Sequence, residues 1–290
     1  MKIALLGVTG MLGNAVLEVF SKSNYDLLLT ARAEPLLSKI KSGQKHKLDA
    51  QNSTVSELEE IIKDCDYAVN CIGIIKSYIH DNNSKEVQTA IEVNSLFPHK
   101  LSLAAKNSGT KIIQIATDCV FDGSKGNYNE NDKHNPLDVY GKTKSLGEVL
   151  EDNVLNLRCS IIGKELKSKT SLLEWFLNQP LNAKVNGFNN HLWNGLTTKV
   201  FAKICLGIIS NNAWFSGLQH IVPKDYLSKA QMLRIFAKTF NREDIDIDEI
   251  NAEESINRTL STLDSKRNED IWQMANYNQI PNVEDMIKDI

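Results

Sequence analysis

Two side chains with complementary proton chemistry, Tyr140 and Lys144, stand four positions apart in this sequence. On a helix, that spacing places both on the same face. A phenol, with an ordinary pKa of about 10, is a poor acid or base at neutral pH. A neighbouring ammonium stabilises the phenolate and lowers its pKa, so the tyrosine can pass a proton to a carbonyl oxygen. The spacing alone is common, and the hypothesis needs support from its surroundings.

Thr117 gives part of that support. It follows a predicted strand, Ile112–Ala116, and so places a hydroxyl at the carboxyl end of a strand, where open α/β sheets bind their ligands. A loop and the start of a helix separate it from Tyr140, which is enough chain to bring the two together. We predict that Thr117 orients a substrate carbonyl, with Tyr140 and Lys144 completing a catalytic triad.

A glycine-rich turn, Gly7-Val8-Thr9-Gly10-Met11-Leu12-Gly13, directly follows the first predicted strand and opens the first predicted helix. Glycines there permit a tight turn, close approach of a pyrophosphate to the backbone, and close packing of helix on sheet. The helix N-terminus supplies free N–H groups and the positive end of a dipole. The turn therefore predicts a dinucleotide site made by Gly7, Thr9, Gly10, Met11, Leu12 and Gly13.

The end of the second predicted strand bears on which dinucleotide binds. It reads Leu29-Thr30-Ala31-Arg32 and lacks the carboxylate that would bind the ribose 2′-hydroxyl of NAD. Thr30 and the forked guanidinium of Arg32 suit a 2′-phosphate instead. We therefore favour NADP(H), with NAD(H) as the alternative cofactor. The competing interpretation makes Arg32 an ordinary surface residue at a strand end.

Short apolar runs alternate with helical patterns through the first half of the chain. The predicted strands are Ile3–Leu6, Asp26–Leu29, Tyr67–Ile72, Ile112–Ala116 and Val154–Cys159. The predicted helices are Met11–Ser21, Val55–Asp64, Lys85–Asn107 and Tyr140–Glu151. Continuous apolar strands are typical of a parallel sheet buried on both faces, and the alternation predicts a Rossmann-like, doubly wound α/β fold.

The pattern changes after Gly163. Helices are predicted at Ser171–Asn178 and Thr197–Ser210, a last strand at Leu218–Val222, and mostly helix thereafter. We predict a dinucleotide-binding domain over residues 1–163, to which residues 196–222 return. A smaller, mainly helical substrate lobe would comprise residues 164–195 and 223–290. The segments Phe121–Pro136 and Asn186–Gly195 are predicted loops.

Composition excludes several classes of partner. The 290 residues include 33 Lys and Arg against 36 Asp and Glu, a net charge of −3, which gives no electrostatic footprint for nucleic acid or an anionic membrane. No apolar stretch approaches the roughly 20 residues that cross a bilayer. The five cysteines are irregularly spaced without a Cys-x-x-Cys pair, which argues against a disulfide framework and fits the cytoplasm. The six histidines show no metal-binding spacing, so we expect no metal.

Several stretches around the triad together resemble a known family. They are Thr117–Gly123 (Thr-Asp-Cys-Val-Phe-Asp-Gly), Tyr128-Asn129-Glu130, Pro136 and Tyr140–Glu148. They closely resemble dTDP-4-dehydrorhamnose reductases and, more broadly, the sugar-nucleotide branch of the extended short-chain dehydrogenases/reductases. The G-x-x-G-x-x-G spacing of the glycine turn is similar to that superfamily's. The resemblance covers the N-terminal two thirds well and the last third loosely.

The resemblance implies roles for particular residues. Thr117, Tyr140 and Lys144 would be catalytic, with Lys144 also bonding the nicotinamide ribose. Cofactor or active-site supports would be Cys71, Ile72, Gly73 and Asn94. Substrate contacts would come from Thr117, Asp118, Cys119 and Val120. A solvent-facing position on its helix is the alternative for Asn94.

Cys119 departs from the family pattern in two ways. Sugar-nucleotide dehydratases of this superfamily carry Glu at this position, and their carboxylate serves water elimination, so Cys119 argues against that chemistry. The rhamnose-precursor reductases carry Tyr here, so the identity of the sugar stays open.

The polar segment Asn186–Gly195 contains two aromatic residues and suits a sugar, which amides bind and aromatic rings stack against. Asn190 and Trp193 are the predicted sugar contacts; the alternative is an ordinary loop anchored by Trp193. His191 is not singled out, and Arg158, at a strand end, is expected to be structural or near a phosphate.

The resemblance implies NADPH-dependent reduction of the keto group of a nucleotide-linked 4-keto-6-deoxysugar, in deoxysugar or surface-polysaccharide synthesis. One alternative is a sugar-nucleotide 4-epimerase with tightly bound NAD. Another is a non-catalytic dinucleotide-sensing regulator. Such proteins usually lose the tyrosine or the lysine, and this sequence has both. Dimers are common in the superfamily, so a homodimer is the expected assembly by analogy alone.

Overall fold

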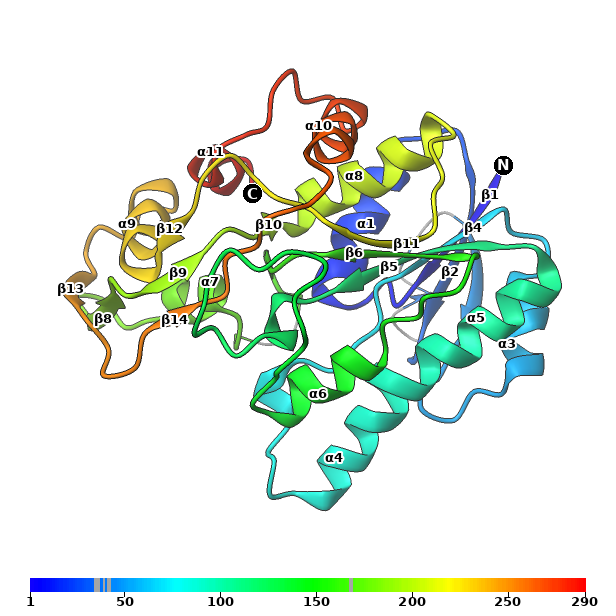
Figure 1. The fold of residues 1–290 in the computed structure, drawn as a ribbon, viewed down its shortest axis with the longest axis horizontal. Coiled ribbons are helices and arrows are strands. Elements are labelled where there is room, and N and C mark those ends of the chain that lie inside the picture. The colour runs from blue at the N-terminus through cyan, green and yellow to red at the C-terminus, as the bar shows by residue number, and fades with distance from the viewer. Residues whose placement is uncertain (34–36, 39, 41–42, 167–168) are drawn as a thin grey trace.

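The computed structural model describes residues 1–33, 37–38, 40, 43–166 and 169–290. Within these ranges, seven strands form one parallel sheet in the order β11-β6-β5-β4-β1-β2-β3 (Figure 1). Their bounds are β1 Lys2–Leu6, β2 Asp26–Ala31, β3 Gln44–Lys47, β4 Tyr67–Asn70, β5 Lys111–Ala116, β6 Val154–Arg158 and β11 Gly217–His220. The strand order reverses direction between β1 and β4, which opens a crevice at the carboxyl ends of these strands. The predicted Rossmann-like parallel sheet is confirmed.

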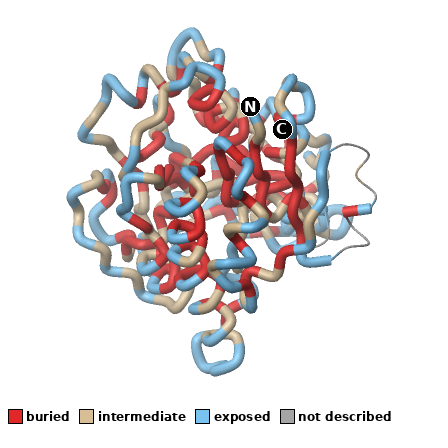
Figure 2. Tube along the Cα trace, turned by 90° about the vertical axis from the view of Figure 1, so that its right-hand side faces the viewer, coloured by how far each residue is buried: buried red, intermediate tan, exposed pale blue. Residues whose placement is uncertain are grey.

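The sheet is buried on both faces because successive side chains of each strand point to opposite sides. In β1, Ile3 and Leu5 join one apolar cluster, and Ala4 and Leu6 join the other. All four are fully buried. Figure 2 shows the buried stretches running through the interior, with exposed chain mostly at the periphery. This two-sided burial is why the strands read as uninterrupted apolar runs.

Helices cover the two faces in separate groups (Figure 1). On one face α1 (Met11–Phe20) packs against α8 (Thr198–Ser210), which in turn contacts α10 (Ser265–Met274). On the other face α3 (Val55–Ile62) packs against α5 (Phe97–Ser108). No helix in the described ranges is both long enough and apolar enough to span a membrane.

The long helical segment predicted at Lys85–Asn107 is present but not uniform. It consists of α4 (Ser84–Ala90), a π-helical stretch η2 (Ile91–Leu96) and α5. The helix that carries the Tyr–Lys pair, α6 (Val139–Leu146), is shorter than the predicted Tyr140–Glu151. It ends at Gly147, where an added Cβ would lie 1.9 Å from the Asn94 carbonyl oxygen of η2.

The predicted lobe has more residues in helices than in strands, as expected, but it also contains short strands that were not predicted. Its helices are α7 Leu172–Leu177, α9 Lys229–Thr239, α10 and α11 Val283–Lys288. Its strands are β8 Lys184–Phe188, β9 His191–Trp193, β12 Leu227–Ser228, β13 Asp246–Ile250 and β14 Ile256–Asn257, with β7 Ile161–Ile162 and β10 Leu196–Thr197 at its base. Strands of two to five residues are too short for apolar alternation to mark them, and they form through partners more than 30 residues away.

Two further predictions of local structure need correction. The predicted loop Asn186–Gly195 lies largely in β8 and β9, joined by a turn at Asn189 and Asn190. The strand β3 was missed because Gln-Lys-His-Lys contains no apolar residue, as an edge strand beside β2 allows. By contrast, the predicted last strand is present as β11, which pairs with β6 at the other edge. The domain boundaries that we drew stay a prediction.

Candidate active site

Thr117, Tyr140 and Lys144 line one cavity of about 530 Å³ at the carboxyl ends of the sheet strands. Thr117 directly follows β5 and caps the short 3-10 turn η3 (Asp118–Val120), its hydroxyl oxygen accepting from the Cys119 N–H at 3.2 Å. The other two project from α6. The structure thus brings the three predicted catalytic residues together from two elements.

Helix α6 comes close to η3 because a glycine stands at Gly141. A Cβ at that position would lie 2.2 Å from the Cys119 carbonyl oxygen, closer than atoms can approach. The helix start is fixed by Asp138, whose carboxylate accepts from the Gly141 N–H at 2.8 Å and pairs with Lys76 at 2.7 Å. These contacts set the distance between the phenol of Tyr140 and the strand end that carries Thr117.

The electrostatics of the pair differ from the simple expectation. Burial raises the pKa of Tyr140, and a hydrogen bond from Thr117 opposes that rise. The Lys144 ammonium donates to the Ile115 carbonyl oxygen at 3.0 Å, so it is turned toward β5. Burial also lowers the pKa of Lys144 from 10.5 to about 8, while the Glu148 carboxylate acts to raise it. The expected lowering of the tyrosine pKa by Lys144 is therefore not seen here, and Thr117 is the group that favours the phenolate.

The glycine turn has the geometry that a dinucleotide site requires. Gly7 has a φ of +83°, and its N–H and that of Val8 both donate to the Thr30 carbonyl oxygen. A Cβ at Gly13 would lie 2.1 Å from the Gly7 carbonyl oxygen, so only glycine lets α1 pack this closely on the turn. Gly10 begins α1 without a side-chain cap, which leaves N–H groups of the first turn available to a phosphate.

A second cavity, of about 680 Å³, extends the first along the crevice between β1 and β4. The two cavities share five lining residues: Gly10, Cys71, Ile72, Gly73 and Ile74. Met11 and Leu12 line the catalytic cavity, and Gly7 and Thr9 line the second one. A continuous cleft therefore runs over the glycine turn from the triad to the end of β2, as an extended dinucleotide needs.

Arg32 lies at the far end of that cleft. It lines the second cavity, is exposed, and makes no hydrogen bond or ion pair with any residue that the structure describes. A guanidinium without a partner among the described residues suits a phosphate at this position. The companion role suggested for Thr30 was wrong, because Thr30 is fully buried and its hydroxyl accepts from the Gly7 N–H at 3.2 Å.

Asn94 is buried behind the cleft and does not line either cavity. Its side-chain amide donates to the Ile74 carbonyl oxygen at 2.9 Å and accepts from the Ile74 N–H at 2.8 Å. It also donates to the Thr143 hydroxyl at 3.3 Å. Asn94 therefore ties the strand-end loop to α6. The structure supports neither a solvent-facing position nor direct contact with a ligand.

The predicted substrate contacts divide into two groups. Asp118, Cys119 and Trp193 line the catalytic cavity with Thr117. Val120 is fully buried in a small apolar cluster and lies outside the cavity lining. Asn190 also lies outside the lining. Its side-chain amide donates to the Ala252 carbonyl oxygen at 2.8 Å and accepts from the Ala252 N–H at 2.9 Å. For Val120 and Asn190 the structure therefore shows a packing role and a turn-fixing role in place of sugar contact.

With this geometry in place, comparison with known proteins supplies the family. A family model described as RmlD substrate binding domain matches residues 1–290. The chain belongs to this family. Two curated relatives illustrate the range of names. One is the methionine adenosyltransferase 2 subunit beta of Bos taurus, 32% identical over 159 residues, or 53% of this chain and 44% of that protein. The other is a dTDP-4-dehydrorhamnose reductase of Aggregatibacter actinomycetemcomitans, 44% identical over 71 residues, 24% of each chain.

Solved structures of dTDP-4-dehydrorhamnose reductases share the fold across the whole chain. That of Clostridium acetobutylicum has a TM-score of 0.74 at 20% identity and covers 100% of this chain and 98% of its own. That of Bacillus anthracis, solved in complex with NADP, has a TM-score of 0.73 at 17% identity, covering 99% and 97%. The alignments to the curated methionine adenosyltransferase 2 subunits beta of Danio rerio and Bos taurus are shorter, and this chain spans less than half of the length of these two relatives.

Within this RmlD-family site, Lys229 is the main lining residue that sequence reasoning missed. It belongs to the lobe, opens α9, and lines the catalytic cavity 5.4 Å from the centre of the Trp193 ring. A capping box at Ser228 and Gln231 marks a helix start in the sequence. No local pattern says that the residue after the cap faces Thr117, because β12 brings it there by pairing with β9.

Arg158 proves to be structural. It is fully buried and donates to both oxygens of Glu148, and to ring nitrogens of His134 and His220 at 2.7 Å each. Burial and the nearby guanidinium lower the pKa of His220 to about 4, which keeps that ring neutral and able to accept. This network joins β6, β11 and the chain just after α6.

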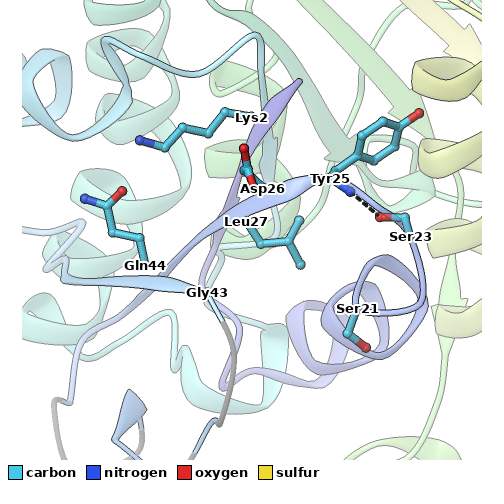
Figure 3. A pocket seen from close by; sticks show the side chains of 8 residues that line it. All are labelled: Lys2, Ser21, Ser23, Tyr25, Asp26, Leu27, Gly43 and Gln44. Carbon is cyan, nitrogen blue, oxygen red and sulfur yellow. Dashed lines mark hydrogen bonds between the residues drawn. The ribbon is translucent and has the colours of Figure 1, made fainter.

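Another pocket, of about 530 Å³, lies at the opposite edge of the sheet (Figure 3). It is lined at the amino ends of the strands by Lys2, Asp26 and Gln44, next to Tyr25, whose backbone N–H donates to the Ser23 hydroxyl at 3.4 Å. It holds none of the predicted catalytic residues. Among the described residues no cluster of three His, Cys, Asp or Glu side chains could hold a metal ion.

Proposed function

We propose that this chain reduces the keto group of a nucleotide-linked 4-keto-6-deoxysugar with NADPH. The observation that carries the proposal is the placing of Thr117, Tyr140 and Lys144 in a cavity continuous with the glycine-turn cleft. Membership of the RmlD family supports a sugar-nucleotide substrate. Deoxysugar or surface-polysaccharide synthesis is the corresponding place for the reaction, and we assign it to the cytoplasm.

The described residues fit NADP(H). The free N–H groups at the start of α1 suit the pyrophosphate, and Arg32 at the far end of the cleft suits the 2′-phosphate. Lys144 would bond the nicotinamide ribose. NAD(H) is the alternative, since Arg32 does not prevent its binding. When bound, the reduced nicotinamide supplies the hydride.

The residues of the triad divide the remaining work. Thr117 donates a hydrogen bond to the substrate keto oxygen and holds it beside the Tyr140 hydroxyl. As the carbonyl carbon accepts hydride, the oxygen takes the phenolic proton of Tyr140, so the product is a secondary alcohol. The Thr117 hydroxyl favours the phenolate that remains until solvent returns the proton. In our proposal the Lys144 ammonium, which donates to the Ile115 carbonyl oxygen without the cofactor, turns toward the cleft when the cofactor binds and then stabilises the phenolate as well. Burial of Tyr140 keeps it protonated before the reaction, as an acid must be.

The direct test is to follow NADPH absorbance while the purified protein is offered a panel of nucleotide-linked 4-keto sugars. We expect consumption of NADPH with at least one 4-keto-6-deoxysugar, in an amount equal to the alcohol formed. Conversion of a nucleotide sugar into its 4-epimer, without net oxidation of added NADPH and with NAD(H) bound after purification, would replace the proposal by a 4-epimerase.

A second candidate function is that of a binding subunit without turnover. Several curated relatives carry the name methionine adenosyltransferase 2 subunit beta, which describes part of an assembly. Tyr140 and Lys144 are both present in this chain, so the reductase remains our first proposal. NADPH binding together with no turnover on the whole panel would favour the binding subunit.

A further inference from the structure

The ammonium of Lys229 has no oxygen partner in the part of the chain that the structure describes. Its one short polar contact is with the Met232 thioether at 3.8 Å, and sulfur is a weak acceptor. The other lysines of the same cavity are satisfied: Lys144 donates to the Ile115 carbonyl oxygen, and Lys76 pairs with Asp138. Lys229 therefore reaches into the cavity with ammonium N–H groups that no oxygen of the described residues accepts from.

The surrounding structure holds the Lys229 side chain in position. Residues Leu227 and Ser228 form β12, which pairs antiparallel with β9, so Leu227 lies opposite Trp193. Ser228 then caps α9 in a reciprocal capping box with Gln231. The ammonium lies over the Trp193 ring at 5.4 Å, a favourable cation–π contact. Strand pairing, cap and ring together hold Lys229 at the lobe side of the cavity.

The charge of the cavity wall is unbalanced toward positive. Its described lining contains three lysines and a single carboxylate, Asp118; Asp138 neutralises Lys76 from outside the lining, which leaves two lysines, Lys144 and Lys229, against one carboxylate. Asp118 also faces the Arg258 guanidinium, which among the described residues donates only to the backbone carbonyl oxygens of Phe121 and Asp122. One carboxylate thus serves more than one cation. Burial lowers the pKa of Lys229 to about 8, and Asp118 acts against that shift, so the ammonium lacks full compensation from the protein.

We propose that Lys229 binds an anionic oxygen of the substrate. The inference rests on the proposed function, and it gives the lobe side of the cavity a specific role. The oxygen belongs to the diphosphate that links nucleotide and sugar, because a 4-keto-6-deoxysugar carries no carboxylate of its own. A carboxylate on a sugar ring would present the same chemistry to an ammonium held over Trp193, and the binding tests separate the two. Lys229 is then a specificity-determining residue that favours diphosphate-linked ligands over ligands without that anion.

The test is calorimetric titration of the NADPH-loaded protein with four probes: thymidine, dTDP, UDP-glucose and UDP-glucuronic acid. The variant is Lys229→Met, which keeps an unbranched chain against Trp193 and Met232 and removes the charge. Lys229→Arg restores the charge. Lys238→Met is the matched control, because it removes a lysine from the exposed face of the same helix.

A charge-assisted hydrogen bond predicts that Lys229→Met weakens binding by about tenfold or more, with Lys229→Arg recovering most of the loss and Lys238→Met unchanged. Equal losses for dTDP, UDP-glucose and UDP-glucuronic acid assign the contact to the diphosphate. A loss for UDP-glucuronic acid alone would move the contact to a sugar carboxylate and would contradict both the diphosphate contact and the 6-deoxysugar of the proposed function. Unchanged affinity for every probe overturns the inference and leaves the reductase proposal standing. If the wild type binds NADPH but none of the probes, both the inference and the nucleotide-sugar substrate are wrong.

Discussion

Lys144 sets a pH limit on the proposed reaction. Its pKa is lowered by burial to about 8, so it is an ammonium below that pH and loses its charge as the pH rises through it. The ammonium is the form that stabilises the tyrosinate, hence kcat/KM for keto reduction falls as the pH rises through about 8. A pH profile of kcat/KM measures this, since it reports the free enzyme.

Glu148 provides a second variant for the same profile. Its carboxylate raises the pKa of Lys144, so Glu148→Gln moves the alkaline limb to lower pH. Lys142→Gln, on the exposed side of α6, leaves the limb in place. A limb near the ordinary lysine pKa of about 10.4 in the wild type contradicts this assignment.

Arg32 is the residue that we propose to distinguish NADPH from NADH. Its guanidinium lines the cleft without a partner among the described residues, so Arg32→Ala removes a contact that only the 2′-phosphate of NADPH can use. We expect NADPH to bind about tenfold or more weakly and NADH nearly unchanged, measured by fluorescence titration. Lys47→Ala, which removes an exposed cation from β3 outside the cleft lining, serves as the control. Equal effects on both cofactors would remove Arg32 from the cofactor assignment.

At this scale the sequence predicts residues whose partners are close in the chain. Thr117, Tyr140 and Lys144 are recognisable because a strand end and one helical turn position them. Lys229 is not recognisable in this way, because the pairing of β12 with β9 places it in the cavity. Neither sequence pattern nor spacing indicates that pairing. Thr30 and Asn190 were predicted as ligand contacts from their positions. Their polar side chains hydrogen-bond to backbone groups of the protein instead, which the sequence does not reveal.

Glycine positions test how the elements of the site are assembled. A Cβ at Gly13 would lie 2.1 Å from the Gly7 carbonyl oxygen, whereas one at Gly10 would lie 3.5 Å from the same atom, an ordinary contact. Gly13→Ala must therefore push α1 from the turn, and we expect a loss of about 1–3 kcal/mol in the free energy of unfolding. Gly10→Ala should retain the wild-type stability and weaken NADPH binding, because its methyl group stands where the pyrophosphate approaches.

Denaturant unfolding of both variants, with NADPH titration of the folded proteins, checks this prediction. Similar stability for Gly13→Ala and the wild type would show that α1 does not depend on the close packing described above.

Elements with a strong local pattern could be predicted, and those defined by distant partners could not. The buried strands β1, β4 and β5 read as apolar runs because both faces are covered. The edge strand β3 is polar, and β12 and β14 are only two residues long. The π-helical stretch η2 has helical periodicity in the sequence. The change in helical winding beside Asn94 therefore cannot be predicted from the sequence pattern.

At the scale of the whole molecule, the cleft lies where the sheet meets the lobe. The sheet side contributes the glycine turn and the triad, and the lobe contributes Trp193 and Lys229. The chemistry follows from the sheet side, whose motifs are local and similar to those of known families. In our proposal the choice of sugar depends on the lobe side, where short strands place Trp193 and Lys229 opposite Cys119 in the cavity. This division is why the sequence supports a proposal for the reaction type and leaves the sugar open.

The measurement that tests the central claim most directly is keto reduction by Tyr140→Phe, compared with the wild type and with Tyr226→Phe, an exposed tyrosine of the lobe. Loss of the phenolic proton predicts that turnover of the active 4-keto sugar falls by about 100-fold or more. NADPH affinity should change little, because the ring stays in place, and Tyr226→Phe should match the wild type. Wild-type turnover in Tyr140→Phe would contradict the account, since the proton would then come from elsewhere.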